Sequence, residues 1–403
     1  MDIFGILSMI GGLALFLYGM EAMGAGLSKL SGGRMERLLE KLTSKRIMAV
    51  LLGAGVTAVI QSSSATTVMV VGFVNSGIMK LNQAVGIIMG ANIGTTITSW
   101  LLSLTGIQGS SFILKMLKPS SFSPILAIVG IIFIMFTKDE KKKDIGSIFL
   151  GFAILMYGME AMSGAVAPLA DNEKFTGILT MFSNPILGLL AGTILTAVIQ
   201  SSSASVGILQ ALCATGAVNF STALPIIMGQ NIGTCVTAII SSIGTSKNAK
   251  RAAAVHLFFN ISGTVIFMVV FYTLNTFVHF SFLNTAASPA GIAVIHSLFN
   301  IGATILLFPF ANLLEKMAIL AIPDKGSEVE EMEEEKINPD LARLDERFLD
   351  KPGFAMEECR GVAINMARKS KKAMNLAIDL LKEYDEKTSA RVEKLENQID
   401  QYE

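Results

Sequence analysis

The sequence predicts an all-α integral membrane protein with two inverted-topology repeats, each holding a re-entrant helical hairpin and a broken helix, and with a cytoplasmic helical tail. Of the 403 residues, 52% are hydrophobic and 16% are charged, and the mean hydropathy is +0.58. Segments 175–246 and 252–314 contain no Asp, Glu, Lys or Arg. Such tracts exceed what a buried helix of a soluble protein needs, so a lipid bilayer is the expected solvent.

An internal repeat predicts the two halves. The sequence TAVIQSSSA occurs at residues 57–65 and again at 196–204, an offset of 139 positions (200 − 61, counted between the two glutamines). The same offset aligns GLALFLYGMEAM (12–23) with GFAILMYGMEAM (151–162), and IIMGANIGT (87–95) with IIMGQNIGT (226–234). Three collinear matches without a gap indicate a duplicated gene.

Seven apolar segments are long enough for spanning helices, and charge predicts their orientation. Lys and Arg collect in cytoplasmic loops. The stretch after the first helix is rich in both, whereas its equivalent in the second half, residues 167–185, has only Lys174. The two halves are therefore expected to be inverted. The basic residues are Lys29, Arg34, Arg37, Lys41, Lys45 and Arg46. The expected spans are 4–27, 83–104, 122–136, 146–166, 223–243, 252–277 and 290–313.

Two further apolar segments, 47–79 and 185–220, must each leave and return to one face of the membrane for this topology to close. We expect each to be a re-entrant hairpin with its QSSS sequence near the point of reversal. Non-helical backbone at that depth is tolerated only where it is buried in protein or lines a wet cavity. The hairpin tips are therefore candidates for a central site.

Three consecutive serines follow the glutamine of each predicted hairpin. If a helix begins at these serines, its free N–H groups and the positive end of its dipole, together with the hydroxyls, form an anion receptor that needs no arginine. Two facing copies could surround a tetrahedral oxyanion. The alternative is that the serines bond within ordinary helices and let them pack closely. The predicted anion ligands are Ser62, Ser63, Ser64, Ser201, Ser202 and Ser203.

Neutral oxygens around the same segments suit sodium. Asn-Ile-Gly-Thr follows each QSSS copy by 31 positions (92 − 61 and 231 − 200) and is expected to unwind its helix locally. Exposed carbonyls, amides and hydroxyls would then be hard neutral ligands. The alternative is a glycine contact between helices with a nearby amide bond. The predicted sodium ligands are Gln61, Thr66, Asn92, Thr95, Gln200, Ser205, Asn231 and Thr234.

Acidic residues are scarce in the predicted membrane region, which favours sodium over protons because proton relays use membrane carboxylates. No Asp or Glu lies between Arg46 and Lys138. Glu21 and Glu160 occupy matching positions in the repeat, near predicted helix ends, where they could reach the interface. The serines have no neighbouring base, so an enzyme is not expected.

The paired QSSS segments, the NIGT segments and the LFLYGM opening resemble the type II sodium/phosphate cotransporter family over about residues 5–312. The resemblance implies that the QSSS hairpins form the phosphate and sodium sites. Ala91 and Gln230 differ before the two asparagines, so the two sites need not be equivalent. Many bacterial members continue into a domain that resembles the phosphate-signalling protein PhoU, and the tail here is similar to its beginning.

These predictions divide the chain into four parts: a first repeat with its connecting helix (1–137), a second repeat with additional helices (138–322), an acidic linker (323–337) and a partial PhoU-like cytoplasmic region (338–403). In the tail, apolar positions at helical spacing over 356–380 and 392–399 predict two helices.

The expected function is sodium-coupled symport of inorganic phosphate by alternating access, with Na⁺ as the coupling ion. The alternatives are a carrier of another oxyanion and a phosphate-responsive sensor that signals through the tail. We expect a multi-pass protein of the inner (plasma) membrane whose partners are phosphate, sodium and lipid. A homodimer is possible, and no nucleic-acid partner is expected.

Overall fold

A computed structural model describes residues 3–31, 45–107, 116, 118–170, 172–323, 341–349 and 352–402. In these ranges the chain is helical apart from turns and one isolated bridge between Asn219 and Ala286, which confirms the predicted all-α class. Three basic residues used to predict the orientation (Arg34, Arg37 and Lys41) and the acidic run of 328–335 lie outside the described residues.

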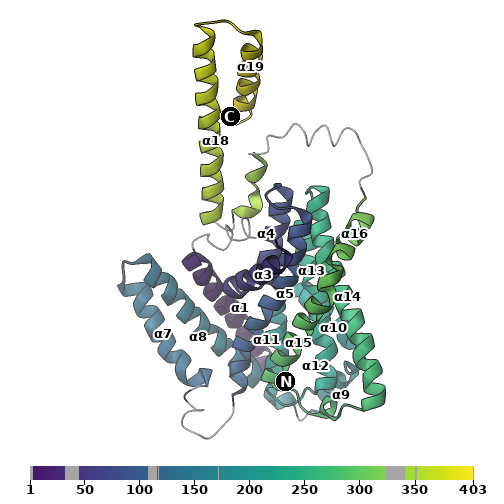
Figure 1. Cartoon of the computed structure of the whole chain (residues 1–403). Helices are drawn as coiled ribbons and strands as arrows, with labels where there is room; N and C mark the ends of the chain where they lie inside the picture. Colours follow the sequence, from purple (N-terminus) through teal and green to yellow (C-terminus); the bar gives the residue numbers. More distant parts are fainter. Residues whose placement is uncertain are drawn as a thin grey trace.

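Within the described ranges, seven helical segments are long and apolar enough to span a membrane, as predicted (Figure 1). Five consist of one α-helix each, and two consist of an α-helix that is followed by a second, shorter one after a break. They are α1 (Ile3–Ser31), α5 (Leu81–Ser103), α7 (Pro119–Phe136), α8 (Glu140–Val166), α12 (Phe220–Gly233) with α13 (Cys235–Ser241), α14 (Lys247–Val278), and α15 (Pro289–Leu307) with α16 (Ala311–Ala321).

Helices α1 and α8 pack antiparallel through glycines. A Cβ on Gly19 would lie 2.6 Å from the carbonyl oxygen of Gly151, and a Cβ on Gly158 would lie 2.6 Å from that of Gly12, so only glycine permits this approach. Gly151 is the repeat equivalent of Gly12, and Gly158 is that of Gly19. Each glycine therefore contacts the equivalent of the other, which is the pattern that a two-fold relation produces.

The predicted unwinding at the first NIGT segment is wrong. Helix α5 runs without a break through Asn92 and Thr95, and in the second half only Thr234 separates α12 from α13. The glycines serve helix contacts instead, because a Cβ on Gly94 would lie 2.5 Å from the carbonyl oxygen of Ala54 on helix α3 (Arg46–Ile60). This is the alternative that the sequence left open.

Each QSSS sequence lies at the junction between two short apolar helices. In the first half α3 ends at Ile60 and α4 (Ser63–Asn75) follows; in the second, α10 (Pro185–Ile199) is followed by α11 (Ser202–Cys213). Helix α9 (Glu173–Met181), which the sequence did not predict, precedes α10 at a bend of 98°. The two halves thus share a pair of short helices with the QSSS sequence between them.

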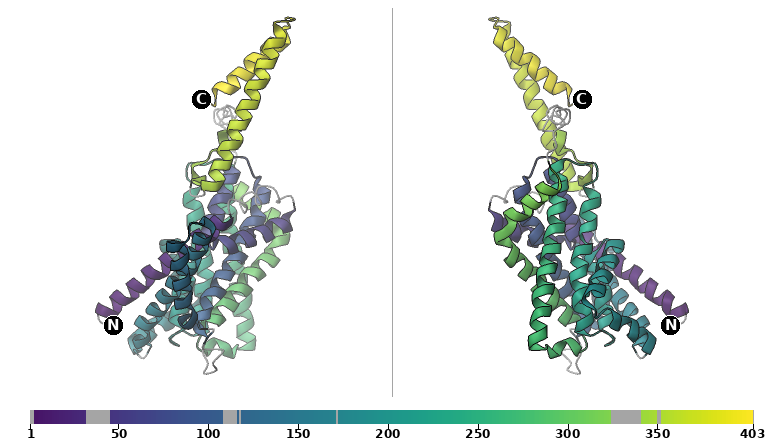
Figure 2. Two further views of the ribbon diagram at one scale, coloured as in Figure 1. Left: turned by 90° about the vertical axis from the view of Figure 1, so that its left-hand side faces the viewer. Right: turned by 90° about the vertical axis from the view of Figure 1, so that its right-hand side faces the viewer.

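The tail contains the two expected helices, α18 (Pro352–Leu380) and α19 (Glu386–Asp400). They project from the end of the bundle toward which α1 runs from its N-terminus (Figure 2). The segment 341–349 packs against the C-terminal end of α4, where the buried ring of Phe348 lies 5.3 Å from that of Phe73.

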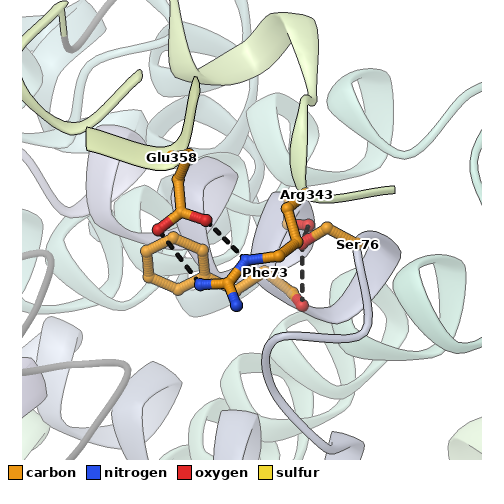
Figure 3. Close-up of polar contacts among 5 residues, drawn as sticks. Phe73, Ser76, Arg343 and Glu358 are labelled. Carbon is orange, nitrogen blue, oxygen red and sulfur yellow. Dashed lines mark hydrogen bonds and ion pairs between the residues drawn. The ribbon is translucent and has the colours of Figure 1, made fainter. Parts of the chain in front are cut away.

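Polar contacts hold the same segment in place. Arg343 donates to Glu358 through Nε at 2.6 Å and Nη2 at 3.3 Å, and this pair lies at the end of α4 that carries Phe73 and Ser76 (Figure 3). Asn75 donates through Nδ2 to Asp345 at 3.0 Å. The tail is therefore fastened to the helix that begins at the first serine cluster.

Candidate substrate cavity

Each QSSS sequence begins with a glutamine in the left-handed backbone conformation. Gln61 has φ 60° and ψ 22°, and Gln200 has φ 59° and ψ 21°. Non-glycine residues rarely adopt this region, since it costs roughly 1–2 kcal/mol. The conformation ends one helix and lets the next begin two residues later. The same local sequence thus produces the same turn in both halves.

The first serine of each triplet caps the helix that follows. Ser62 Oγ accepts a hydrogen bond from the Ala65 N–H at 3.1 Å, and Ser201 Oγ accepts one from the Ala204 N–H at 3.2 Å. Helix geometry leaves the N–H groups of the first residues without acceptors inside the helix. Here those residues are the second and third serines, Ser63 and Ser64 in α4 and Ser202 and Ser203 in α11.

The two tips meet. Ser63 Oγ lies 3.4 Å from Ser202 Oγ, and these residues are repeat equivalents. Ser64 Oγ donates to the Gln200 carbonyl oxygen at 3.5 Å. Beside this contact lies a cavity of about 400 Å³ formed by both tips and one face of α1. Its lining residues are Leu17, Met20, Glu21, Gly24, Ala25, Ser28, Ile60, Gln61, Ser62, Ser63, Ser64, Ala65, Gln200, Ser201, Ser202 and Ser203.

All six serines predicted to bind an anion therefore line one cavity. Two helix N-termini, each with unsatisfied N–H groups and the positive end of a dipole, converge there. None of the lining residues in the described part of the chain is Lys or Arg. The cavity is thus suited to an anion that is recognised by N–H and hydroxyl donors.

The residues predicted as sodium ligands divide into two groups. Gln61 and Gln200 line the cavity, and Thr66 and Ser205 are buried in the first turns behind it. The NIGT residues are buried and do not line it. Their side chains bond to carbonyls four residues earlier: Asn92 at 3.5 Å, Thr95 at 3.1 Å, Asn231 at 3.0 Å and Thr234 at 2.9 Å.

Behind the tips the two halves differ in hydrogen bonding. Thr57 Oγ1 donates to Thr66 Oγ1 at 3.0 Å. The equivalent hydroxyls, Thr196 Oγ1 and Ser205 Oγ, are buried without a hydrogen-bond partner in the described chain. A buried hydroxyl without a partner carries a desolvation penalty, so this pair is suited to a ligand that brings its own charge.

The two glutamines also differ in burial and in hydrogen bonding. Gln61 is buried, accepts from Thr98 Oγ1 at 2.9 Å and donates to the Ala58 carbonyl at 2.5 Å. Gln200 is exposed toward the cavity. Thr237, the equivalent of Thr98, instead donates to Ser64 of the other half at 3.5 Å. The two tips have the same backbone but different surroundings.

Sequence reasoning did not find the contribution of α1. Glu21, Gly24 and Ser28 line the cavity on one helical face. Glu21 does not sit at a helix end as expected, since α1 continues to Ser31. Its repeat equivalent Glu160 is exposed and is not among the lining residues. The spacing of these three α1 residues was the available signal, but nothing local shows which face meets a cavity.

In the described part of the chain, seven segments long and apolar enough to span a membrane, together with a cavity at the meeting point of two helix tips, indicate a multi-pass membrane protein. The sequence profile of the Na⁺/Pi-cotransporter family matches residues 15–164 and again 154–294, so each half matches by itself. The chain belongs to this family, as the resemblance predicted. The family is one of transporters, which agrees with the expectation that the chain is not an enzyme.

Named relatives support this assignment. The uncharacterized protein YqeW of Bacillus subtilis is 29% identical over 315 residues, which cover 78% of this chain and 97% of YqeW. YjbB of Salmonella typhimurium, provisionally named an inorganic phosphate export protein, is 27% identical over 79% of this chain; the match spans only 56% of YjbB. The sodium-dependent phosphate transport protein 2A of Rattus norvegicus is 39% identical over 113 residues, which cover 27% of this chain and 17% of that protein. No solved structure shows a significant match.

Proposed function

We propose that this protein carries inorganic phosphate across the membrane together with sodium by alternating access. The observation that carries the proposal is the meeting of two serine-capped helix N-termini, one from each half, in a single cavity. The names of the family and of two relatives supply the identity of the anion and of the coupling ion.

The phosphate ligands in this proposal are the six serines of the two triplets, Ser62–Ser64 and Ser201–Ser203. Their N–H groups and hydroxyls replace the hydration shell of the anion, and the two helix dipoles favour its negative charge. Ser63 and Ser202 lie closest to one another, so an anion held by both tips would interact with these two hydroxyls first.

Sodium is proposed to bind among the neutral oxygens of the same region. The unpartnered hydroxyls of Thr196 and Ser205 and the exposed amide of Gln200 support a site in the second half. Gln61 and Thr66 are the equivalents in the first half. The proposal also includes the four NIGT residues. They do not line the cavity, so we propose that they act from behind the tips. They are Asn92, Thr95, Asn231 and Thr234.

The exchange of glycine contacts between α1 and α8 supports the inverted repeat, because a two-fold relation makes each half contact the equivalent surface of the other. Re-entrant hairpins, an inner-membrane location and a cytoplasmic tail belong to the same proposal. Residues 17–28 of α1, which line the cavity, lie in the C-terminal half of that helix, which is nearer to the C-terminal tail of the protein. With the tail inside the cell, the cavity would face the cytoplasm.

The proposed division into parts 1–137, 138–322, 323–337 and 338–403 follows the same layout. The likeness of the tail to PhoU and a possible homodimer remain predictions.

The test is phosphate flux in proteoliposomes with sodium imposed on one side. We expect flux that depends on the sodium gradient. Ser63→Ala and Ser202→Ala should each lower phosphate affinity by roughly 10- to 100-fold, because a hydrogen bond to a charged group contributes about 1.5–3 kcal/mol. Ser8→Ala, at an exposed position of α1 away from the cavity, is the matched control. Unchanged transport in both cavity variants would refute the site.

A sensor that reports phosphate through the tail is the second candidate, and the docking of residues 341–349 on α4 favours it. Counterflow of radiolabelled phosphate separates the two, since a sensor would show none. Competition by unlabelled sulfate and other oxyanions in the same assay identifies the anion.

A further inference from the structure

Helix α1 brings one carboxylate to the cavity. Among the described residues that line it, Glu21 is the single acidic one and the other side chains are neutral. Glu21 is exposed on this side of the cavity. A carboxylate beside an anion site opposes anion binding, because like charges repel. A cation held between the carboxylate and the anion would remove this repulsion and stabilise both.

The C-terminal end of α3 faces the same part of α1. The last carbonyls of a helix have no partner inside the helix and carry the negative end of its dipole. Gly24 lies against this end, and a Cβ built on it would stand 3.2 Å from the Ile60 carbonyl oxygen. Ile60 also lines the cavity. A carboxylate and a helix-end carbonyl thus lie on the same side of the cavity, and both can supply an oxygen ligand to a cation.

The second half does not repeat this arrangement. Ser163 stands at the position equivalent to Gly24, and its Oγ donates to the Ala211 carbonyl on α11 at 3.2 Å. Helix α8 therefore packs against α11. Glu160 is exposed, as Glu21 is, but it does not line the cavity. The repeat itself thus provides two glutamates at matched positions, of which one lines the cavity.

We propose that Glu21, with the Ile60 carbonyl oxygen, binds a sodium ion on the α1 side of the cavity, next to the anion site. The proposal rests on the phosphate-carrying function and adds to it a cation site in one half only. The cation lies at the C-terminal end of α3 while the anion lies at the N-terminal ends of α4 and α11. Each ion thus occupies the helix end of opposite partial charge, and each should raise the affinity for the other.

The experiment measures equilibrium binding of ²²Na⁺ to the full chain in lipid nanodiscs, with and without inorganic phosphate. The variants are Glu21→Gln, Glu21→Asp and the matched control Glu160→Gln. We expect Glu21→Gln to lose one sodium ion per chain, or to bind it at least 10-fold more weakly, and to lose the increase in sodium affinity that phosphate causes. Glu21→Asp should restore part of both effects, and Glu160→Gln should match the wild type.

Equal sodium binding by Glu21→Gln and the wild type, or equal losses in Glu21→Gln and Glu160→Gln, would overturn the proposal. Phosphate counterflow is measured on the same samples. If the wild type shows no counterflow, the transport function fails; the sodium site at Glu21 is still decided by the binding measurement without phosphate.

Discussion

The two QSSS tips have the same backbone and different surroundings. Gln61 and Gln200 adopt the same left-handed conformation, and Ser62 and Ser201 cap the next helix in the same way. The first tip is closed by hydrogen bonds, however, while in the second Thr196 and Ser205 have buried hydroxyls without partners in the described chain. The local sequence therefore determines the turn, and the packing of neighbouring helices determines which oxygens remain available.

The helices next to the tips also differ. Helix α1 packs against the end of α3 through Gly24, whereas α8 uses Ser163 to bind α11. If the halves exchanged these arrangements, the hydrogen bonds that close the first tip would be lost there, and the equivalent bonds would form in the second tip. Such an exchange is the simplest form of alternating access in an inverted repeat. The substitutions below test the features that the tips share and then those in which they differ.

The largest effect is expected from the glycine contacts that support both tips. Gly94→Leu and Gly233→Leu would each force apart two helices whose backbones touch. We expect the free energy of unfolding to fall by about 3 kcal/mol or more in either variant, because a side chain forced against a neighbouring backbone cannot be accommodated by rearranging side chains. Thermal unfolding of the detergent-purified protein measures it. Gly55→Leu is the control, since a Cβ there meets nothing within 4 Å. A similar loss of stability in Gly55→Leu would contradict the conclusion that the effect comes from the contact between helix backbones.

Replacing the two glutamines should affect the stability of the protein differently at the two tips. Gln61→Ala removes the acceptor of a buried Thr98 hydroxyl and should destabilise the protein by about 2 kcal/mol. Gln200→Ala removes an exposed side chain and should change unfolding stability by less than about 0.5 kcal/mol. The same thermal assay compares them. Equal shifts would mean that the tips do not differ in solution.

The hydroxyl pairs behind the tips should respond with opposite signs. In buffer without sodium or phosphate, Thr66→Val breaks the bond from Thr57 and should destabilise by about 1 kcal/mol. Ser205→Ala removes a buried hydroxyl without a partner and should be neutral or slightly stabilising. Added sodium should stabilise the wild type more than Ser205→Ala. If sodium stabilises both equally, Ser205 is not a ligand.

The smallest effect concerns the left-handed residue itself. Gln200→Gly should relieve the strained backbone and stabilise by about 0.5–1 kcal/mol. At Gln61 the same change should give no gain, because the bond to Thr98 is lost with the side chain. Chemical unfolding of both variants measures the difference. A gain at both positions would show that the Thr98 bond contributes little.

The sequence was sufficient for the seven apolar segments and for the position of the central anion-site candidates at the helix breaks, because these depend on apolar length and local turn chemistry. It failed at Asn92–Thr95, since a glycine in a helix can permit either unwinding or close packing, and only the partner helix decides between them. It also failed to find Glu21 in the cavity. Which face of α1 meets the tips depends on how α1 crosses α3, and that contact lies between residues distant in the chain.

Asn75, at the far end of α4 from the serines, uses both halves of its amide. Its Oδ1 accepts from the Ser246 N–H at 2.8 Å, where α14 begins, and its Nδ2 donates to Asp345. Phe348 is buried beside it, on Phe73. A shift of α4 along its axis would therefore have to drag α14 and the tail with it or release one of them. Any movement of the helix that holds the first serine triplet would therefore have to change the contacts of the tail.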